Sequence, residues 1–144
     1  MILADSGFWI ALGNRRDRHH GAARDALERY GREGFASTWP VLTEVTHLLV
    51  ARVGVVQALA FMEGIAAGAC EIPDPPPDAL MRANVLMSRY RDLPMDLADA
   101  SLVILAEELG EGRILSTDQR DFEGYRWKSR QPFDNLLLSA GQGS

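Results

Sequence analysis

The stretch MDLADASLVILAEELGEGRILSTDQRDF, residues 95–122, decides how the rest of the chain folds. The segment from Met95 to Leu109 is apolar on almost every side, which is typical of a helix buried inside a domain. Gly110 and Gly112 end this helix, and the segment from Arg113 to Thr117 is predicted to be a short buried strand. Four carboxylates lie where this helix begins and in the acidic loop where this strand ends: Asp96, Asp99, Asp118 and Asp121.

Strand-like and helix-like segments alternate along the chain. Strands are expected at 1–5, 35–38, 69–72 and 113–117 and around Tyr125 and Trp127, and helices at 6–12, 21–30, 41–52, 55–67, 78–91 and 95–109. The strands are too short and apolar for an exposed sheet, so the sequence predicts an α/β fold with a central, mainly parallel sheet covered by helices. A length of 144 residues favours one domain, expected over 1–140, with 141–144 as a disordered tail.

The composition is that of an ordinary soluble protein, with 47% hydrophobic and 24% charged residues. No apolar run reaches the roughly 20 residues of a membrane span. A strand begins directly at Met1, so no signal peptide is expected, and a cytoplasmic protein with no membrane partner is predicted. The net charge of −5 argues at first against nucleic acid. All but one of the 15 basic residues are arginine, which suits a phosphodiester ligand, although codon bias explains this equally well.

Four acids occupy comparable positions in the predicted fold. Asp5 follows the first strand, Glu44 lies in the first turns of the helix after the second, Asp99 begins the central helix, and Asp118 follows a later strand. Taken singly, acids at helix starts only favour the helix dipole or cap the helix. If the strands form one parallel sheet, all four converge at its carboxyl edge, where they cannot all stay ionised without a cation. Mg²⁺ or Mn²⁺ is the hard, oxygen-seeking ion that suits such a site, and it promotes phosphodiester hydrolysis.

Four segments of the chain resemble the PIN domain, most nearly the small type that includes VapC-like toxins of bacterial toxin–antitoxin pairs. They are LADS (3–6), TEVTHLL (43–49), ADASLV (98–103) and STDQRDF (116–122), and the resemblance spans Met1 to Trp127. It implies a PIN-like three-layer α/β/α sandwich. It also implies an endoribonuclease that depends on Mg²⁺ or Mn²⁺ and leaves 5′-phosphate and 3′-hydroxyl ends, a homodimer, and a cognate antitoxin that occludes the site.

The resemblance assigns roles to individual residues. The catalytic acids would be Asp5, Glu44, Asp99 and Asp118. Of these, Asp5, Asp99 and Asp118 would hold the metal, while Glu44 orients or deprotonates the attacking water. Ser6 and Thr117 match hydroxyl positions that support the acids, and Asp96 and Asp121 are supporting acids that compete with Asp99 and Asp118 for the metal. Arginines close to these acids are expected to contact the RNA backbone: Arg15, Arg16, Arg18 and Arg120.

Two other functional classes stay open at this stage. A catalytically idle PIN-like module would serve as an RNA- or protein-binding adaptor, although the complete set of four acids argues against it. A phosphatase-type hydrolase with an aspartyl nucleophile would need a second acid soon after Asp5, and the sequence has Ser6 and Gly7 there. The helices after Asp5 and Glu44 carry apolar and aromatic residues that would suit a homodimer face.

Overall fold

The computed structural model describes residues 1–137, so the predicted tail at 141–144 lies outside the described residues, as do the side chains of Gln119 and Arg120. The elements follow in the order β1 (Ile2–Ala4), α1 (Ser6–Gly13), α2 (His20–Tyr30), β2 (Phe35–Ala36), α3 (Trp39–Arg52), α4 (Val55–Ala66), α5 (Ala79–Arg89), α6 (Leu97–Leu109), β3 (Arg113–Leu115), α7 (Gln119–Gly124), β4 (Arg126–Trp127), β5 (Gln131–Pro132) and β6 (Asp134–Asn135).

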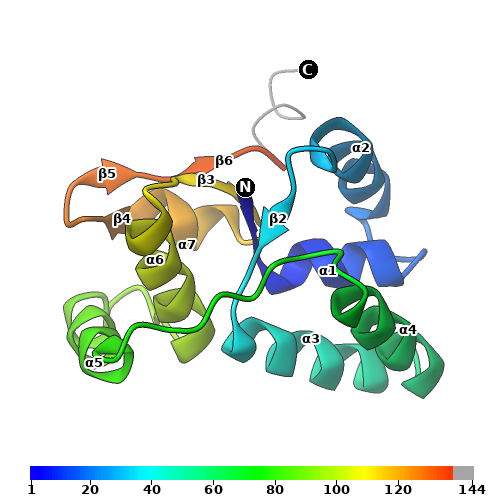
Figure 1. Cartoon of the computed structure of the whole chain (residues 1–144), viewed down its shortest axis with the longest axis horizontal. Coiled ribbons are helices and arrows are strands. Elements are labelled where there is room, and N and C mark those ends of the chain that lie inside the picture. Colours follow the sequence, from blue (N-terminus) through cyan, green and yellow to red (C-terminus); the bar gives the residue numbers. More distant parts are fainter. Residues whose placement is uncertain (138–144) are drawn as a thin grey trace.

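Within the described chain, the central sheet has the strand order β2-β1-β3-β6, and every neighbouring pair is parallel. Leu3 pairs with Ala36 on one side and with Ile114 on the other, and Ile114 pairs in turn with Asn135. Helices α1 to α4 lie to one side of these strands and α5 to α7 to the other (Figure 1). The predicted α/β sandwich with a parallel sheet is therefore confirmed, and the carboxyl ends of all four strands face the same edge.

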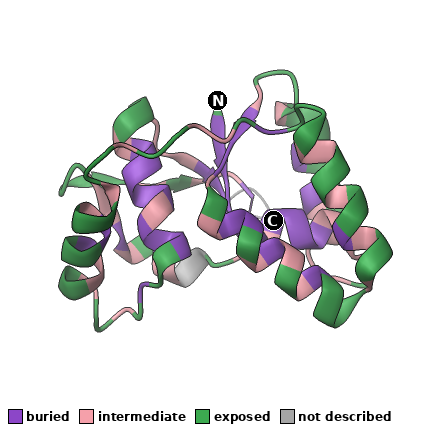
Figure 2. Ribbon diagram, turned by 60° about the horizontal axis from the view of Figure 1, so that its bottom comes forward, coloured by how far each residue is buried: buried purple, intermediate pink, exposed green. Residues whose placement is uncertain are grey.

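The sheet and helix α6 form the centre of the core. All three residues of β1 are fully buried, because a parallel sheet with helices on both faces has no side exposed to water. Helix α6 is buried over most of its circumference, as its apolar sequence predicts. Figure 2 shows buried residues along the strands and on the helix faces turned towards them, with exposed residues on the outer faces. Among the described residues, no helix is long and apolar enough to span a bilayer.

Two local predictions need correction, one predicted strand pairs outside the main sheet, and one strand was not predicted. The strand expected at 69–72 is reduced to a single bridge between Ala36 and Glu71, because the prolines that begin at Pro73 lack the N–H groups that extend a ladder. The acidic loop after β3 is helix α7, which Asp118 caps. The strand expected around Tyr125 and Trp127 is β4, which pairs antiparallel with β5 outside the main sheet. The fourth strand of the main sheet, β6, has the polar sequence Asp-Asn and was not predicted.

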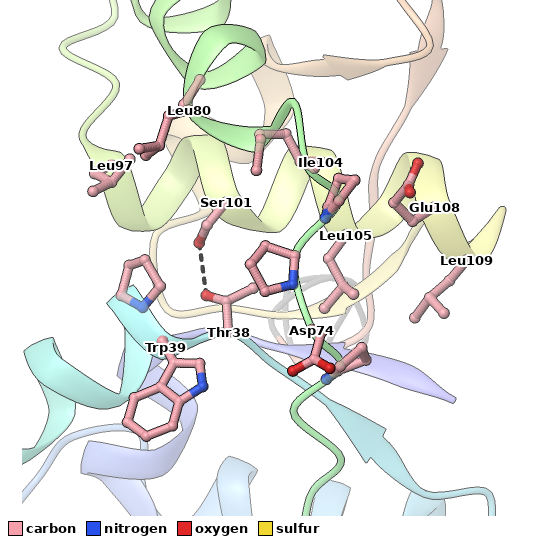
Figure 3. A pocket seen from close by; sticks show the side chains of 16 residues that line it. Thr38, Trp39, Asp74, Leu80, Leu97, Ser101, Ile104, Leu105, Glu108 and Leu109 are labelled. Atoms are coloured by element: carbon pink, nitrogen blue, oxygen red, sulfur yellow. Dashed lines mark hydrogen bonds between the residues drawn. The ribbon is translucent and has the colours of Figure 1, made fainter.

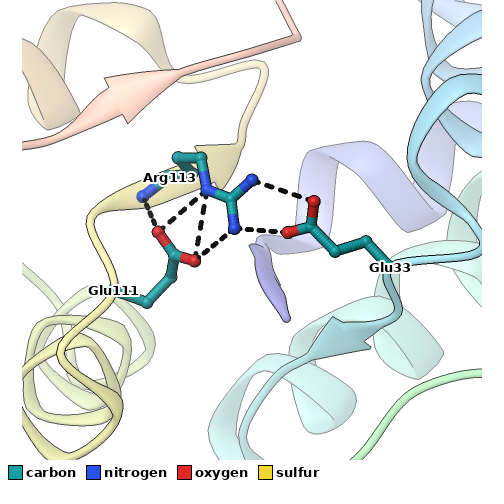
Figure 4. Close-up of polar contacts among 3 residues, drawn as sticks. All are labelled: Glu33, Glu111 and Arg113. Carbon is teal, nitrogen blue, oxygen red and sulfur yellow. Dashed lines mark hydrogen bonds and ion pairs between the residues drawn. The ribbon is translucent and has the colours of Figure 1, made fainter.

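An ion-pair cluster joins two strands at the amino edge of the sheet, opposite to its carboxyl edge. The Arg113 guanidinium, at the start of β3, donates from Nη2 to Glu111 Oε1 over 2.6 Å and from Nη1 to Glu33 Oε1 over 3.0 Å. Nη2 also donates to Glu33 Oε2 (Figure 4). Glu33 lies just before β2, so the cluster connects the amino ends of β2 and β3.

Candidate active site

Asp5 is the most buried of the predicted acids, with only 5% of its surface exposed. It is the N-cap of α1, because its Oδ1 accepts a hydrogen bond of 2.7 Å from Ser6 N. Its second oxygen, Oδ2, accepts a hydrogen bond of 2.8 Å from Ser116 Oγ. Both carboxylate oxygens are thus held from β3 and from the start of α1 at the carboxyl edge of the sheet.

Ser6 connects Asp5 with Glu44. The Ser6 hydroxyl lies 3.4 Å from Asp5 Oδ1 and donates a short hydrogen bond to Glu44 Oε1. Glu44 is half-buried and projects from α3, whose first turn contains Pro40 and is capped by Thr38 Oγ1. The supporting hydroxyl that the sequence predicted at Ser6 is therefore in direct contact with two of the four acids.

Asp99 and Asp96 form a reciprocal capping box at the start of α6. Asp96 Oδ1 accepts from Asp99 N over 2.8 Å, and Asp99 Oδ2 accepts from Asp96 N over 3.3 Å. Asp96 is the exposed N-cap, and Asp99, at the third helical position, is 8% exposed. Of the two acids, Asp99 is therefore the buried one and Asp96 the helix cap.

Ser116 is a site residue that the sequence reasoning missed. Its Oγ donates to Asp5 and accepts a hydrogen bond of 2.9 Å from Asp118 N, so one hydroxyl connects two acids. Asp118 is exposed and caps α7 through a bond of 3.4 Å from Asp121 N. Thr117, which was predicted for this supporting role, packs against Gly7, where a Cβ atom would collide with its hydroxyl. The available signal was the position of Ser116 at the end of a buried strand, two residues before Asp118.

Burial and mutual repulsion raise the pKa of two of the acids. The pKa of Asp5 rises from 3.8 to about 6, first because of burial and then because of the nearby Glu44 and Asp118 carboxylates. The pKa of Asp99 rises to about 8, again through burial first, followed by the charges of Asp96 and Asp5. Because these carboxylates raise one another's pKa, the four acids lie close enough to interact electrostatically. A bound cation would stabilise their charged forms.

The donor set fits a hard divalent cation, because it consists of carboxylates and hydroxyls. Among residues 1–137, however, no three His, Cys, Asp or Glu side chains are grouped closely enough to hold one ion. Side chains must therefore shift before three carboxylates can bind the same ion. Asp118 is the acid with most room to do so, since it is exposed and lies at the start of the short helix α7.

Three of the four predicted substrate-binding arginines lie on a loop away from the acids. Arg15, Arg16 and Arg18 are exposed on the loop that follows α1. Helix α1 begins beside Asp5 and rises about 1.5 Å per residue, which puts this loop roughly 12 Å or more along the helix from the acids. The side chain of Arg120 lies outside the described residues, so its predicted contact stays a prediction.

Comparison with known proteins identifies the family. The family model of the PIN domain matches residues 2–128, and the chain therefore belongs to the PIN domain family. Among curated proteins, ribonuclease VapC26 of Mycobacterium tuberculosis is 26% identical over 125 residues, which cover 87% of this chain and 92% of that protein.

Solved structures share the fold. The sarcin–ricin loop cleaving toxin VapC20 of Mycobacterium tuberculosis has a TM-score of 0.76 at 24% identity, over 84% of this chain and 92% of that one. A chain of VapBC2 from Rickettsia felis, bound to a DNA fragment from its promoter, has a TM-score of 0.68 at 14% identity, over 94% of this chain and 99% of that one. At these identities the likeness establishes the PIN fold.

Proposed function

We propose that this protein is a metal-dependent endoribonuclease and the toxin of a toxin–antitoxin pair. The observation that carries the proposal is that three acids at the carboxyl edge of a PIN-fold sheet, Asp5, Glu44 and Asp118, are connected through the hydroxyls of Ser6 and Ser116. Asp99 lies close enough to this group for the charge of Asp5 to raise its pKa. The curated relative VapC26 is named a ribonuclease, and the structural neighbour VapC20 is described as a sarcin–ricin loop cleaving toxin, which supports a nuclease activity here.

The acids divide into two roles in this proposal. Asp5, Asp99 and Asp118 would hold Mg²⁺ or Mn²⁺, with Asp96 and Asp121 as supporting acids. A divalent ion supplies positive charge where negative charge develops on the phosphate, and it favours the ionisation of water. Glu44, half-buried and held by Ser6, would orient the attacking water or take its proton. Arg15, Arg16, Arg18 and Arg120 would contact RNA phosphates beyond the scissile bond.

The proposal includes two protein partners, a second copy of the chain and a cognate antitoxin. Large apolar side chains are exposed on α4 and α5, and such patches mark protein interaction surfaces. They include Val55, Val56, Leu59, Leu80, Met81 and Val85. An apolar cavity of about 400 Å³ lies between the start of α3, α5 and α6, with Trp39, Leu80 and Leu97 at its lining (Figure 3).

Helix α1, considered for the dimer face from its sequence, instead turns Phe8, Trp9 and Ile10 into the core. The exposed surfaces of α4 and α5 are therefore the better support for a dimer. Light scattering of the purified protein should give twice the chain mass. A cytoplasmic location and a single domain over 1–140 complete the proposal.

The test is RNA cleavage by the purified, partner-free protein and by two isosteric variants. Glu44→Gln and Asp99→Asn retain side-chain volume and remove charge, so each should fold and lose at least about 100-fold in rate. Cleavage by both variants at the wild-type rate would show that the acids take no part in the reaction. Well-folded wild type that cleaves no RNA with either metal would favour the idle adaptor.

A further inference from the structure

A buried tyrosine hydroxyl contacts the acid cluster from the side of α7. Tyr125 follows α7, is fully buried, and lies with its hydroxyl 3.2 Å from Asp99 Oδ2 and 3.2 Å from Leu93 O. The hydroxyl has one proton to donate. Asp99 is the stronger acceptor whenever it is ionised, since hydrogen bonds to a charged oxygen are about twice as strong as neutral ones.

Two hydrogen bonds to Asp99 reach the same carboxylate oxygen. Two donors to this carboxylate, Tyr125 Oη and Asp96 N, both point to Oδ2. The two donors together fix the rotation of the carboxylate about its last bond. They leave Oδ1 as the oxygen turned away from both donors.

Tyr125 is itself held rigidly by aromatic neighbours. Its ring packs edge to face on Phe122 and on Tyr90, with centroids 5.2 Å apart in each pair. Its backbone N donates to Asp121 O over 3.0 Å and so ends α7. A phenol ordinarily has a pKa of about 10, so the Tyr125 hydroxyl is protonated and remains a donor at neutral pH.

We propose that Tyr125 is a positioning residue for Asp99: the Tyr125 hydroxyl holds Oδ2, and Oδ1 is the oxygen that would bind a divalent cation. This inference rests on the proposed function and adds a residue to it. The same tyrosine also ends α7, the helix that Asp118 caps. Tyr125 therefore contacts Asp99 through its side chain and the helix of Asp118 through its backbone. Groups that orient a metal ligand in this way typically contribute 10- to 100-fold to metal affinity.

The test compares Tyr125→Phe with Tyr90→Phe as a matched control. Both remove one hydroxyl from the same aromatic cluster, but the Tyr90 hydroxyl accepts from Arg126 N over 3.1 Å and lies outside the acid cluster. Mn²⁺ binding to the RNA-free protein is measured by electron paramagnetic resonance. We expect Tyr125→Phe to bind Mn²⁺ about 10-fold more weakly and Tyr90→Phe to bind it like the wild type. At saturating Mn²⁺, RNA cleavage by Tyr125→Phe should return to the wild-type rate.

The outcomes separate this inference from the proposed function. Equal Mn²⁺ affinity of Tyr125→Phe and wild type overturns the role of Tyr125 and leaves the nuclease proposal intact. Wild type that neither binds Mn²⁺ nor cleaves RNA overturns both. If Tyr125→Phe does not fold, the inference is tested on the wild type and on Tyr90→Phe instead. Binding of Mg²⁺ should then change the tyrosine absorbance of both proteins, and an unchanged spectrum overturns the inference.

Discussion

Ser116 and Asp5 are joined by a hydrogen bond of 2.8 Å between two fully or almost fully buried side chains, from Ser116 Oγ to Asp5 Oδ2. The same hydroxyl accepts from Asp118 N over 2.9 Å. One serine at the end of β3 therefore orients the most buried acid of the site and fixes the backbone of the most exposed one.

Ser116→Ala should lower RNA cleavage by about 10- to 100-fold, because Asp5 loses the donor that orients it. The matched control is Ser37→Ala, since Ser37 is also fully buried and donates to a backbone oxygen, Ala4 O, over 2.8 Å. Each variant should lose roughly 1 kcal/mol of stability in urea unfolding. Only Ser116→Ala should lose activity, and equal activity of the two variants would mean that Ser116 does not orient the site.

The raised pKa of Asp5 predicts how the stability of the metal-free protein depends on pH. Its folded-state pKa of about 6 exceeds the ordinary 3.8, so the folded protein binds this proton more tightly than the unfolded chain does. Stability should therefore fall as the pH rises from about 4 to about 6, by an amount on the order of 3 kcal/mol for this group. Asp99, whose pKa rises to about 8, acts in the same direction at higher pH.

Unfolding in EDTA at a series of pH values measures this effect. Asp5→Asn should be less sensitive to pH than the wild type between pH 4 and 6, whereas Asp25→Asn, which changes an exposed acid on α2, should follow the wild type. Adding Mn²⁺ at neutral pH should stabilise the wild type, because the ion binds the folded state. Parallel profiles for wild type and Asp5→Asn would show that Asp5 titrates normally.

A hydroxyl pair fastens the helix that carries Glu44 to the helix that carries Asp99. Thr38 Oγ1 and Ser101 Oγ are 2.6 Å apart, and Ser101 Oγ also donates to Ala98 O over 2.6 Å, so Thr38 is the donor of the pair (Figure 3). Ser101→Ala should cost about 1 kcal/mol in denaturant unfolding. Thr43→Ala, at an exposed position of the same α3, should change stability by less than about 0.5 kcal/mol. A Ser101→Ala protein as stable as wild type would show that the pair contributes nothing.

Arg113→Gln tests whether the ion-pair cluster at the amino edge of the sheet acts independently of the site. The Arg113 and Glu33 side chains are 37% and 42% exposed, so solvent screens the pair and the expected loss is at most about 1 kcal/mol. The loss should shrink in 1 M salt, where the screening length falls to about 3 Å. RNA cleavage should be unchanged, and a clear loss of activity in a folded variant would contradict this separation.

The sequence predicted the elements that depend on local pattern. Helix α6 is apolar on nearly all sides and starts with Asp96 and Asp99, so its burial and its capping box both follow from adjacent residues. The parallel sheet followed from short apolar strands separated by helices, and with it the convergence of Asp5, Glu44 and Asp118.

Features that depend on distant partners were not predictable. Ser116 and Thr117 carry similar hydroxyls, and only the position of β3 beside β1 decides which one reaches Asp5. Strand β6 is polar because it lies at the edge of the sheet, so it has no apolar pattern. Tyr125 and Asp99 are 26 residues apart in the sequence. Their contact depends on helix α7, which the sequence analysis expected to be a loop.

The most direct test of the central claim is a time course of RNA cleavage by the wild type in Mg²⁺, Mn²⁺ or EDTA, with Asp5→Asn and Asp25→Asn measured in parallel. We predict discrete RNA fragments with 5′-phosphate ends from the wild type and from Asp25→Asn in either metal, and none in EDTA or from Asp5→Asn. Fragments that persist in EDTA, or that Asp5→Asn produces at the wild-type rate, would contradict the account.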